Sequence, residues 1–268
     1  MVARMKRFPS DFADMLTRKG RRILEGRVPD LCGVLGDPAR PFVAVAGAIE
    51  AEKARAAHAL LDRTLRAALV PLEAPIPLGS IWNQTRNYQE RLPKTARMRT
   101  VYLERRGRAF QAAEAIGLLA MMRSDSFRAF AQTVSGRTLA PEFGQQVLCY
   151  GAGDYAGPHT DHHPEDPRSA GGYVDMHVSF GHGDVASQYL VYAPKGHFTE
   201  MVNVNTPGGI TVYRLPFWHY TTPLQPQRGR EAKARRWVVL GTFLYADPLP
   251  APVPGAAPYD PLARGRQA

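Results

Sequence analysis

The sequence predicts an α+β fold, with helices in the first half of the chain and antiparallel strands in the second. Alanine, glutamate, arginine and leucine dominate long proline-free segments before residue 135, and such segments favour helices. Beyond residue 140, short β-branched or aromatic runs alternate with turns that contain glycine and proline. Helices followed by a series of short strands are typical of a chain whose second half forms an antiparallel sandwich or a small barrel.

Helices are the main elements expected in the first half. They cover residues from about 10 to 26, 48 to 70, 109 to 123, and from Ser124 or Asp125 to about 134. Two short runs in the same half, 42–46 and 99–103, have the apolar or alternating pattern of strands. A stretch that contains Pro71, Pro75 and Pro77 interrupts the helical pattern between them.

Strands are expected throughout the second half. The runs with strand character are 145–150, 173–180, 188–192, 198–204, 210–215 and 237–245. We therefore expect a single domain over residues 1–247, mainly helical over 1–135 and with its sheets over about 140–247. Six of the fourteen residues 248–261 are proline, which predicts an extended, poorly ordered tail over 248–268.

The overall composition is that of a globular chain with a real core. Of 268 residues, 44 % are hydrophobic and 22 % are charged, which excludes a disordered, collagen-like or coiled-coil protein. Two cysteines cannot build a disulfide framework, so a reducing compartment is expected. Pro9, Asp11 and Asp14 stand where a signal peptide would need its apolar segment, and these features predict a cytoplasmic protein.

The net charge of +10 is concentrated in a few segments. Residues 1–22 carry seven basic and two acidic groups, and residues 91–108 carry seven basic groups and one acidic group. A third cluster lies in residues 228–236. Such clusters could bind nucleic acid, and a non-catalytic basic module is one interpretation of the chain. No zinc-finger, RNA-recognition or helix-turn-helix signature accompanies the charge, so solvated surfaces are the simpler explanation.

The histidines point to a metal site. Seven of the eight lie between His159 and His219, within the strand-rich half. His159 and Asp161 are two residues apart, and on a strand such residues point to the same face. A third ligand would complete a set of two histidines and one carboxylate, which leaves coordination positions open and suits iron(II). His219, 58 residues after Asp161, is the best candidate.

At these residues the sequence resembles the iron(II)- and 2-oxoglutarate-dependent dioxygenases, and among them the prolyl-4-hydroxylase-like branch. The resemblance covers roughly residues 140–247. Its four motifs are, in chain order, Cys149-Tyr150-Gly151 leading to His159-Thr160-Asp161, Pro207-Gly208-Gly209-Ile210-Thr211-Val212-Tyr213, His219-Tyr220-Thr221-Thr222-Pro223-Leu224, and Arg236-Trp237-Val238-Val239-Leu240.

The resemblance implies a double-stranded β-helix (jelly-roll) catalytic core with the N-terminal helices packed on the larger sheet. It implies that His159, Asp161 and His219 are the catalytic residues that bind Fe(II). Arg236 would pair with the distal carboxylate of the co-substrate 2-oxoglutarate, and Tyr150 would donate its hydroxyl to it. The implied enzyme is a hydroxylase that uses O2 and releases succinate and CO2, with ascorbate as an optional reductant.

Arg230 and Arg235 are alternatives to Arg236. In the family the cation usually lies closer to the distal histidine than the 17 residues that separate Arg236 from His219. Strand alternation favours Arg236, because it puts this residue on one face with Val238, Leu240 and Thr242. The second interpretation of the site is a cupin-like metal-dependent enzyme that keeps the triad but uses no 2-oxoglutarate and does not need Arg236.

The sequence leaves the substrate open. An amino-acid-derived small molecule, a peptide and a protein side chain are all compatible with the resemblance, and no pattern indicates the oligomeric state or a membrane partner. His177 shares a strand face with Asp175 and Ser179. Its imidazole either lines the cavity or is a satisfied part of the core.

Overall fold

The computed structural model describes residues 5–37, 40–75, 95–103, 106–161, 172–193, 198 and 200–246. The α-helices are α1 (Arg18–Leu24), α2 (Ala51–Thr64), α3 (Arg108–Ala115), α4 (Leu118–Met122) and α5 (Asp125–Ser135). Short 3-10 helices are η1 (Phe12–Met15), η2 (Pro29–Leu31), η3 (Val34–Gly36) and η4 (Arg66–Ala68). The predicted tail 248–268 lies outside the described residues.

The strands are β1 (Phe42–Val45), β2 (Val70–Pro75), β3 (Thr95–Tyr102), β4 (Leu139–Gly151), β5 (Tyr155–His159), β6 (Tyr173–Phe180), β7 (Val185–Ser187), β8 (Tyr189–Tyr192), β9 (Glu200–Asn203), β10 (Gly209–Leu215), β11 (His219–Thr221), β12 (Gln225–Pro226) and β13 (Arg235–Tyr245). All the pairings among them are antiparallel.

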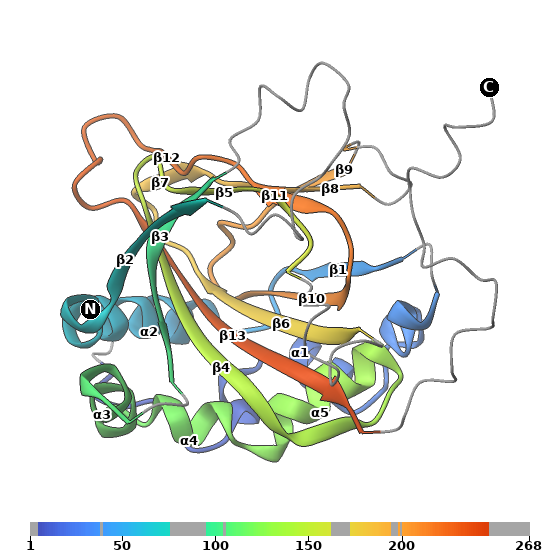
Figure 1. Cartoon of the computed structure of the whole chain (residues 1–268). Coiled ribbons are helices and arrows are strands. Elements are labelled where there is room, and N and C mark those ends of the chain that lie inside the picture. Colours follow the sequence, from blue (N-terminus) through green and yellow to red (C-terminus); the bar gives the residue numbers. More distant parts are fainter. Residues whose placement is uncertain are drawn as a thin grey trace, which may run out of the picture.

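Two facing layers of strands form a jelly-roll, as expected. The larger layer has the order β1-β10-β6-β13-β4-β3, with β2 beside β3, and the smaller layer has the order β5-β11-β8-β9. Short pairing between β3 and β5, at Ala96 opposite Ala156, joins the two layers into one folded sheet. Figure 1 shows the smaller layer above the larger one. A separate pair, β7 and β12, lies at one end.

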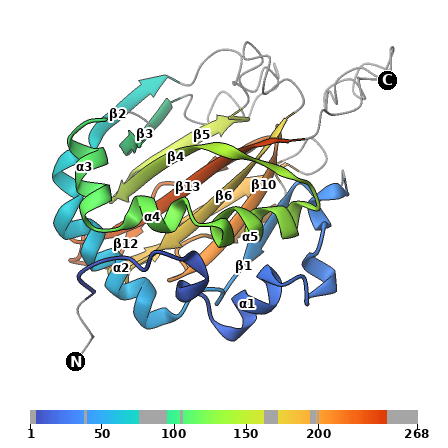
Figure 2. The ribbon, with the colours of Figure 1, turned by 90° about the horizontal axis from the view of Figure 1, so that it is seen from below.

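The helices cover the outer face of the larger layer, also as expected. Figure 2, seen from below, shows α4 and α5 crossing β4, β13 and β6. Alternate residues of β13 point to opposite sides: Trp237, Val239 and Phe243 join the core under the helices, whereas Val238 and Leu240 belong to an inner cluster. A second inner cluster joins Tyr213 of β10 and Leu190 of β8. The inner faces of the two layers therefore carry side chains that pack between the layers.

Two of the expected helices are broken in the structure. The segment predicted as one helix over 10–26 consists of η1 and α1, because the Thr17 side chain caps α1 by accepting from the Gly20 amide. The segment predicted over 109–123 divides into α3 and α4 at Gly117, whose φ of 76° is left-handed.

The first half also contributes more strand than expected. The helix predicted to reach residue 70 ends at Thr64, and Val70 begins β2, which pairs with β3. Pro71 and Pro75 are compatible with this position, since β2 pairs with only one of the described strands. β3 and β4 are both longer than predicted. They pair with each other, and this pairing joins a strand of the first half to the strands of the second half.

None of the helices in the described part of the chain combines the length and apolar character needed to cross a membrane.

Candidate metal and co-substrate site

A tight turn between β4 and β5 orients the strand that carries the first histidine. The Asp154 carboxylate accepts from the Gly151 amide at 2.8 Å, and Gly153 has a φ of 76°. Arg97 of β3 donates to the Gly153 carbonyl at 2.6 Å and to the Asp154 carboxylate at 3.2 Å. The turn is therefore held by a hydrogen bond within it and by Arg97 of the neighbouring strand. β5 begins after this turn and ends at His159.

His159, Asp161 and His219 meet between the end of β5 and the start of β11. His159 and His219 are direct cross-strand partners, with ring centroids 4.4 Å apart. The Nε2 atoms of His159 and His219 lie 3.0 and 3.2 Å from different oxygens of the Asp161 carboxylate. One ligand atom from each residue lies within 4.8 Å of the others, so the three side chains converge on one point.

Asp161 reaches this point in a way that strand alternation does not predict. β5 ends at His159, and Asp161 follows outside the strand with a φ of 56°, the only positive φ of a non-glycine residue in the described chain. Aspartate tolerates the left-handed region better than most residues. The reversal turns the carboxylate back toward both imidazoles. The expectation that His159 and Asp161 share a strand face is therefore wrong, although their convergence is correct.

Backbone carbonyls set the orientation of both imidazoles. Nδ1 of His159 lies 2.5 Å from the Gly157 carbonyl oxygen, and Nδ1 of His219 lies 3.2 Å from that of Phe217. Donation from Nδ1–H to a carbonyl leaves the lone pair on Nε2, where a metal would bind. The Phe217 ring stacks on His219 at 4.8 Å. The donor atoms are thus held in place by the fold itself.

The three groups also perturb one another electrostatically. Burial raises the pKa of Asp161, but the adjacent His159 and His219 outweigh it and hold the pKa well below the ordinary value of a carboxyl. Burial lowers the pKa of His219, and the nearby His159 lowers it further. Burial also lowers the pKa of His159, but the Asp161 carboxylate more than reverses that effect. The site therefore favours an ionised carboxylate.

Arg236 lies inside the sandwich and is only 4 % exposed. Its Nε donates to the Gln188 Oε1 at 2.7 Å, and its Nη1 donates to the Ser179 hydroxyl at 3.1 Å. Its guanidinium also stacks over the Tyr150 ring at 4.7 Å from the centroid. Among the described residues no carboxylate forms an ion pair with it. Burial lowers the pKa of Arg236. A buried cation with only neutral partners is suited to an anionic ligand.

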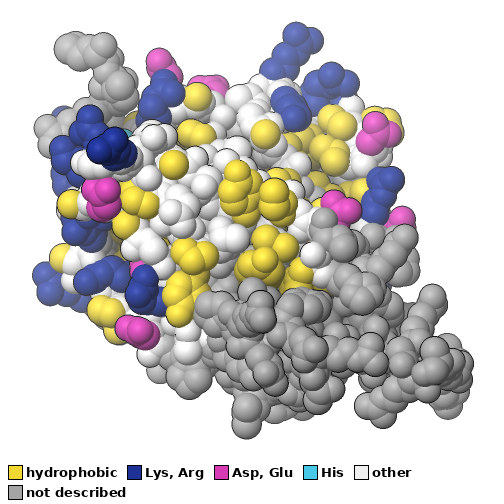
Figure 3. Space-filling model, turned by 90° about the horizontal axis from the view of Figure 1, so that it is seen from above, with side chains coloured by type: hydrophobic (Ala, Val, Ile, Leu, Met, Phe, Trp, Pro, Cys, Tyr) yellow, Lys and Arg dark blue, Asp and Glu magenta, His cyan; other side chains and the backbone are white. Residues whose placement is uncertain are grey.

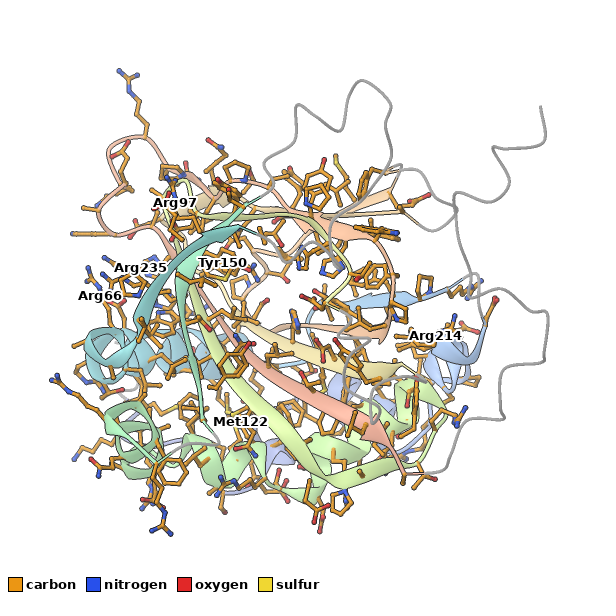
Figure 4. The ribbon with its side chains drawn as sticks, viewed as in Figure 1. Arg66, Arg97, Met122, Tyr150, Arg214 and Arg235 are labelled. Atoms are coloured by element: carbon orange, nitrogen blue, oxygen red, sulfur yellow. The ribbon has the colours of Figure 1, made fainter. Side chains whose placement is uncertain are left out.

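The structure separates Arg236 from its two sequence alternatives. Arg235 points to the other side of β13, where its Nε lies 3.5 Å from Asp62 of α2, and Figure 4 shows it at the outer edge near Arg66. Arg230 lies on the surface, 3.7 Å from Asp184. Of the three arginines, only Arg236 lies on the inner face of β13, as strand alternation favours.

Tyr150 also lies inside, directly opposite Arg236 in the pairing of β4 with β13 (Figure 4). Burial raises the pKa of its hydroxyl, and the positive charge of Arg236 opposes this only in part. The phenol is therefore neutral and can donate a hydrogen bond. Its ring supports the guanidinium, a contact that the sequence analysis did not foresee.

Sequence reasoning missed two partners of Arg236. Gln188 is fully buried, and its amide nitrogen donates to the Asp154 and Thr222 carbonyls at 3.2 and 3.1 Å. Those bonds turn its carbonyl oxygen toward Arg236. Ser179 is the second partner. Gln188 and Ser179 are 48 and 57 residues from Arg236 in sequence, and only alternation along β6, which places Ser179 on the face of His177, gave a signal.

The described Lys and Arg side chains that are visible in Figure 3 do not form a continuous surface on that face. Hydrophobic side chains occupy its centre, and the described Lys and Arg side chains lie toward its margins, interspersed with Asp and Glu. This arrangement gives no support to a nucleic-acid interface on that face.

Comparison with solved structures identifies the fold. A prolyl-4-hydroxylase from Pseudomonas putida superposes with a TM-score of 0.50 and 14 % identity, covering 84 % of this chain and all of that chain. A prolyl 4-hydroxylase from Phytophthora capsici superposes with a TM-score of 0.52 and 15 % identity, covering 90 % of this chain and 70 % of the other. No protein-family model and no curated protein sequence matches the chain. The shared architecture is the jelly-roll of these hydroxylases.

Proposed function

We propose that this protein is an iron(II)- and 2-oxoglutarate-dependent oxygenase that hydroxylates an amino-acid-derived small molecule, a peptide or a protein side chain. The observation that supports this most strongly is the presence, inside one jelly-roll, of a converging His-Asp-His set and a buried arginine that lacks an acidic partner among the described residues. The first suits a metal ion, and the second suits the carboxylate of a co-substrate.

The donor set fits iron(II). Two imidazole nitrogens and one carboxylate oxygen come from adjacent strand ends and approach from one side, so exogenous ligands could occupy the other positions. Both imidazoles already present Nε2. When bound, iron(II) and 2-oxoglutarate would supply the oxidation: O2 and the 2-oxo acid are converted to succinate and CO2, with one oxygen atom inserted into a substrate C–H bond.

The residues of the chain would bind and orient the co-substrate. Arg236 retains unused guanidinium donors after its bonds to Gln188 and Ser179, and a planar guanidinium can donate two parallel bonds to a carboxylate. Tyr150 would hold the guanidinium plane and donate to the same ligand. Because these groups are buried, the charge pairing would occur where water screens it little.

The proposal is tested by comparing succinate formation in the wild type and in two variants, Arg236→Ala and Arg235→Ala. The purified chain is incubated with iron(II), O2, labelled 2-oxoglutarate and ascorbate, which returns the iron to iron(II) when no substrate is present, and succinate and CO2 are quantified. We expect slow substrate-independent turnover that is lost in Arg236→Ala and retained in Arg235→Ala, the outward-facing neighbour. If the chain binds iron but does not convert 2-oxoglutarate to succinate, or if the two variants have equal effects, the cupin-like alternative is favoured instead.

A further inference from the structure

A second polar group lies on the inner face of β6, close to the triad. Tyr173, Asp175 and His177 alternate along the strand and share this face. Asp175 is 3 % exposed and lies opposite Tyr213 of β10 on one side and Thr242 of β13 on the other. The carboxyl group is therefore built into the interior of the sandwich.

Asp175 and His177 each have a buried polar atom that has no hydrogen-bond partner among the described residues. These atoms are Oδ1 of Asp175 and Nε2 of His177. His177 Nε2 lies 4.0 Å from the other Asp175 oxygen, too far for a hydrogen bond, while its Nδ1 lies 3.1 Å from the Tyr213 hydroxyl. Leaving such atoms unpaired destabilises the folded state, because they lose their hydrogen bonds to water on burial. In a native protein this is a reason to look for a ligand.

Two contacts connect this pair to the metal ligands. The Tyr213 ring lies 4.5 Å from the His177 ring and 5.6 Å from the His219 ring, measured between centroids. At the other end of the strand, the Tyr173 hydroxyl donates to the Asp161 carbonyl. Asp175 lies between these two contacts along β6. A molecule bound to it would therefore lie beside the triad.

The surroundings of Asp175 favour a cation as the missing partner. No lysine or arginine in the described chain forms an ion pair with it, and the charged groups that act on it are His177, 4.0 Å away, and the Asp161 carboxylate. The rings of Tyr173, Tyr213 and Phe217 belong to the adjoining inner cluster, and aromatic faces attract cations. Burial raises the pKa of Asp175, and His177 offsets this only in part, so a bound cation would favour the ionised form.

We propose that Asp175 and His177 form a subsite that binds a protonated amine of the substrate. Asp175 Oδ1 would accept one N–H, and His177 Nε2 would accept a second when Nδ1 donates to the Tyr213 oxygen. The inference rests on the proposed function, because it assigns the amine to the substrate of the neighbouring triad. It narrows that substrate to a compound that carries a primary or secondary amine.

Three probes of similar shape test the subsite: n-butylamine, n-butanol and butyrate. Their dissociation constants are measured by ligand-observed NMR with the full metal-free chain at pH 7, in the presence of saturating 2-oxoglutarate so that butyrate cannot bind at Arg236. Because the chain has a net charge of +10, non-specific attraction favours butyrate and cannot explain a preference for the amine. We expect n-butylamine to bind at least tenfold more tightly than the other two.

Asp175→Asn keeps the shape of the side chain and removes its charge, and Asp184→Asn does the same to a carboxylate near the surface. The amine preference should disappear in the first and persist in the second. If the wild-type protein does not prefer the amine, or prefers the alcohol, the assignment is wrong. This comparison needs no variant, so it remains valid even if Asp175→Asn does not fold. Retained preference in a folded Asp175→Asn overturns it as well.

Failure of the amine subsite can be distinguished from failure of the proposed oxygenase function. Asp175 is not one of the three metal ligands, so Asp175→Asn should still bind iron(II) and 2-oxoglutarate. If wild-type protein fails to bind 2-oxoglutarate, the oxygenase proposal fails whatever the amine does. If it binds 2-oxoglutarate but shows no amine preference, only the subsite fails.

Discussion

Gln188 determines whether Arg236 is available to an anion. Its two donations to backbone carbonyls fix which end of the amide faces the guanidinium, and that end is a neutral oxygen. A neutral acceptor holds the arginine in position without cancelling its charge. The lack of an acidic partner for Arg236 in the described part of the chain therefore depends on this amide, which lies between β7 and β8.

Substitution of Gln188 by glutamate should impair co-substrate binding more than removal of the amide does. In Gln188→Glu the new carboxylate would pair with Arg236 in advance, and we expect the dissociation constant for 2-oxoglutarate to rise by about 100-fold. In Gln188→Met the cation loses one hydrogen bond but stays unpaired, and the expected rise is about tenfold. Calorimetric titration under anaerobic conditions measures both. A smaller effect of glutamate than of methionine would contradict the assigned role of Arg236.

The position of Asp161 shows what a sequence can and cannot predict about this site. The pattern of His159, Asp161 and His219 is sufficient to predict that the three converge. It does not predict a left-handed backbone at Asp161, because that conformation depends on the end of β5 and on the neighbouring strands. That Gln188 and Ser179 are partners of Arg236 could not be predicted for a related reason. They lie far from Arg236 in the sequence, and their orientation depends on tertiary contacts.

Among the secondary-structure elements, the helices differ from expectation where glycine or a capping side chain interrupts them. Composition predicted helical segments, but Thr17 and Gly117 divide two of them. The strands of the first half were underestimated for another reason. β2 and β3 are stabilised by pairing with each other and with β4, and such long-range pairing leaves only a weak trace in a local pattern.

The end of α5 depends on a close approach of two glycines. Gly136 terminates the helix with a φ of 68°, and a Cβ atom there would lie 2.7 Å from the Gly33 Cα. We expect Gly136→Ala to lower the free energy of unfolding by about 3 kcal/mol, since backbone strain and a clash add. Gly229→Ala is the matched control, because its φ is 73° but no atom lies within 4 Å of the added Cβ. There we expect about 1 kcal/mol. Urea denaturation measures both, and equal losses would exclude the clash.

His58 of α2 makes stability depend on pH. Burial lowers its pKa to about 4, and the stacked ring of His182, 4.7 Å away, contributes to this. The unfolded chain takes up the proton first, so the stabilising effect is complete above the ordinary histidine pKa and is lost as the pH falls from there toward about 4. Between pH 7 and pH 5 the loss from this residue should be about 2 kcal/mol.

His58→Gln provides the comparison, because an amide can still donate to the Arg235 carbonyl that His58 contacts at 3.2 Å. Urea denaturation at the two pH values should show a smaller pH-dependent loss in this variant than in the wild type. The same loss in both proteins would show that His58 is not the group that titrates.

At the scale of the whole molecule, the jelly-roll brings together residues that are far apart in the chain. The candidate metal ligands lie at the ends of β5 and β11 in the smaller layer, whereas Arg236 and Asp175 lie on β13 and β6 of the larger one. The helical first half supplies the cover for the larger layer and, through β3, the pairing that connects it to β5. We expect these residues, which lie between the two layers, to bind iron(II) and 2-oxoglutarate together.

Anaerobic absorption spectroscopy tests that claim most directly. Iron(II) and then 2-oxoglutarate are added without oxygen to the metal-free wild-type chain, to Asp161→Ala and to Asp184→Ala as a control. We predict that the wild type and the control develop the visible charge-transfer band of a 2-oxo acid chelated to iron(II), and that Asp161→Ala does not. Iron binding without the band in the wild type, or an undiminished band in Asp161→Ala, would contradict the account.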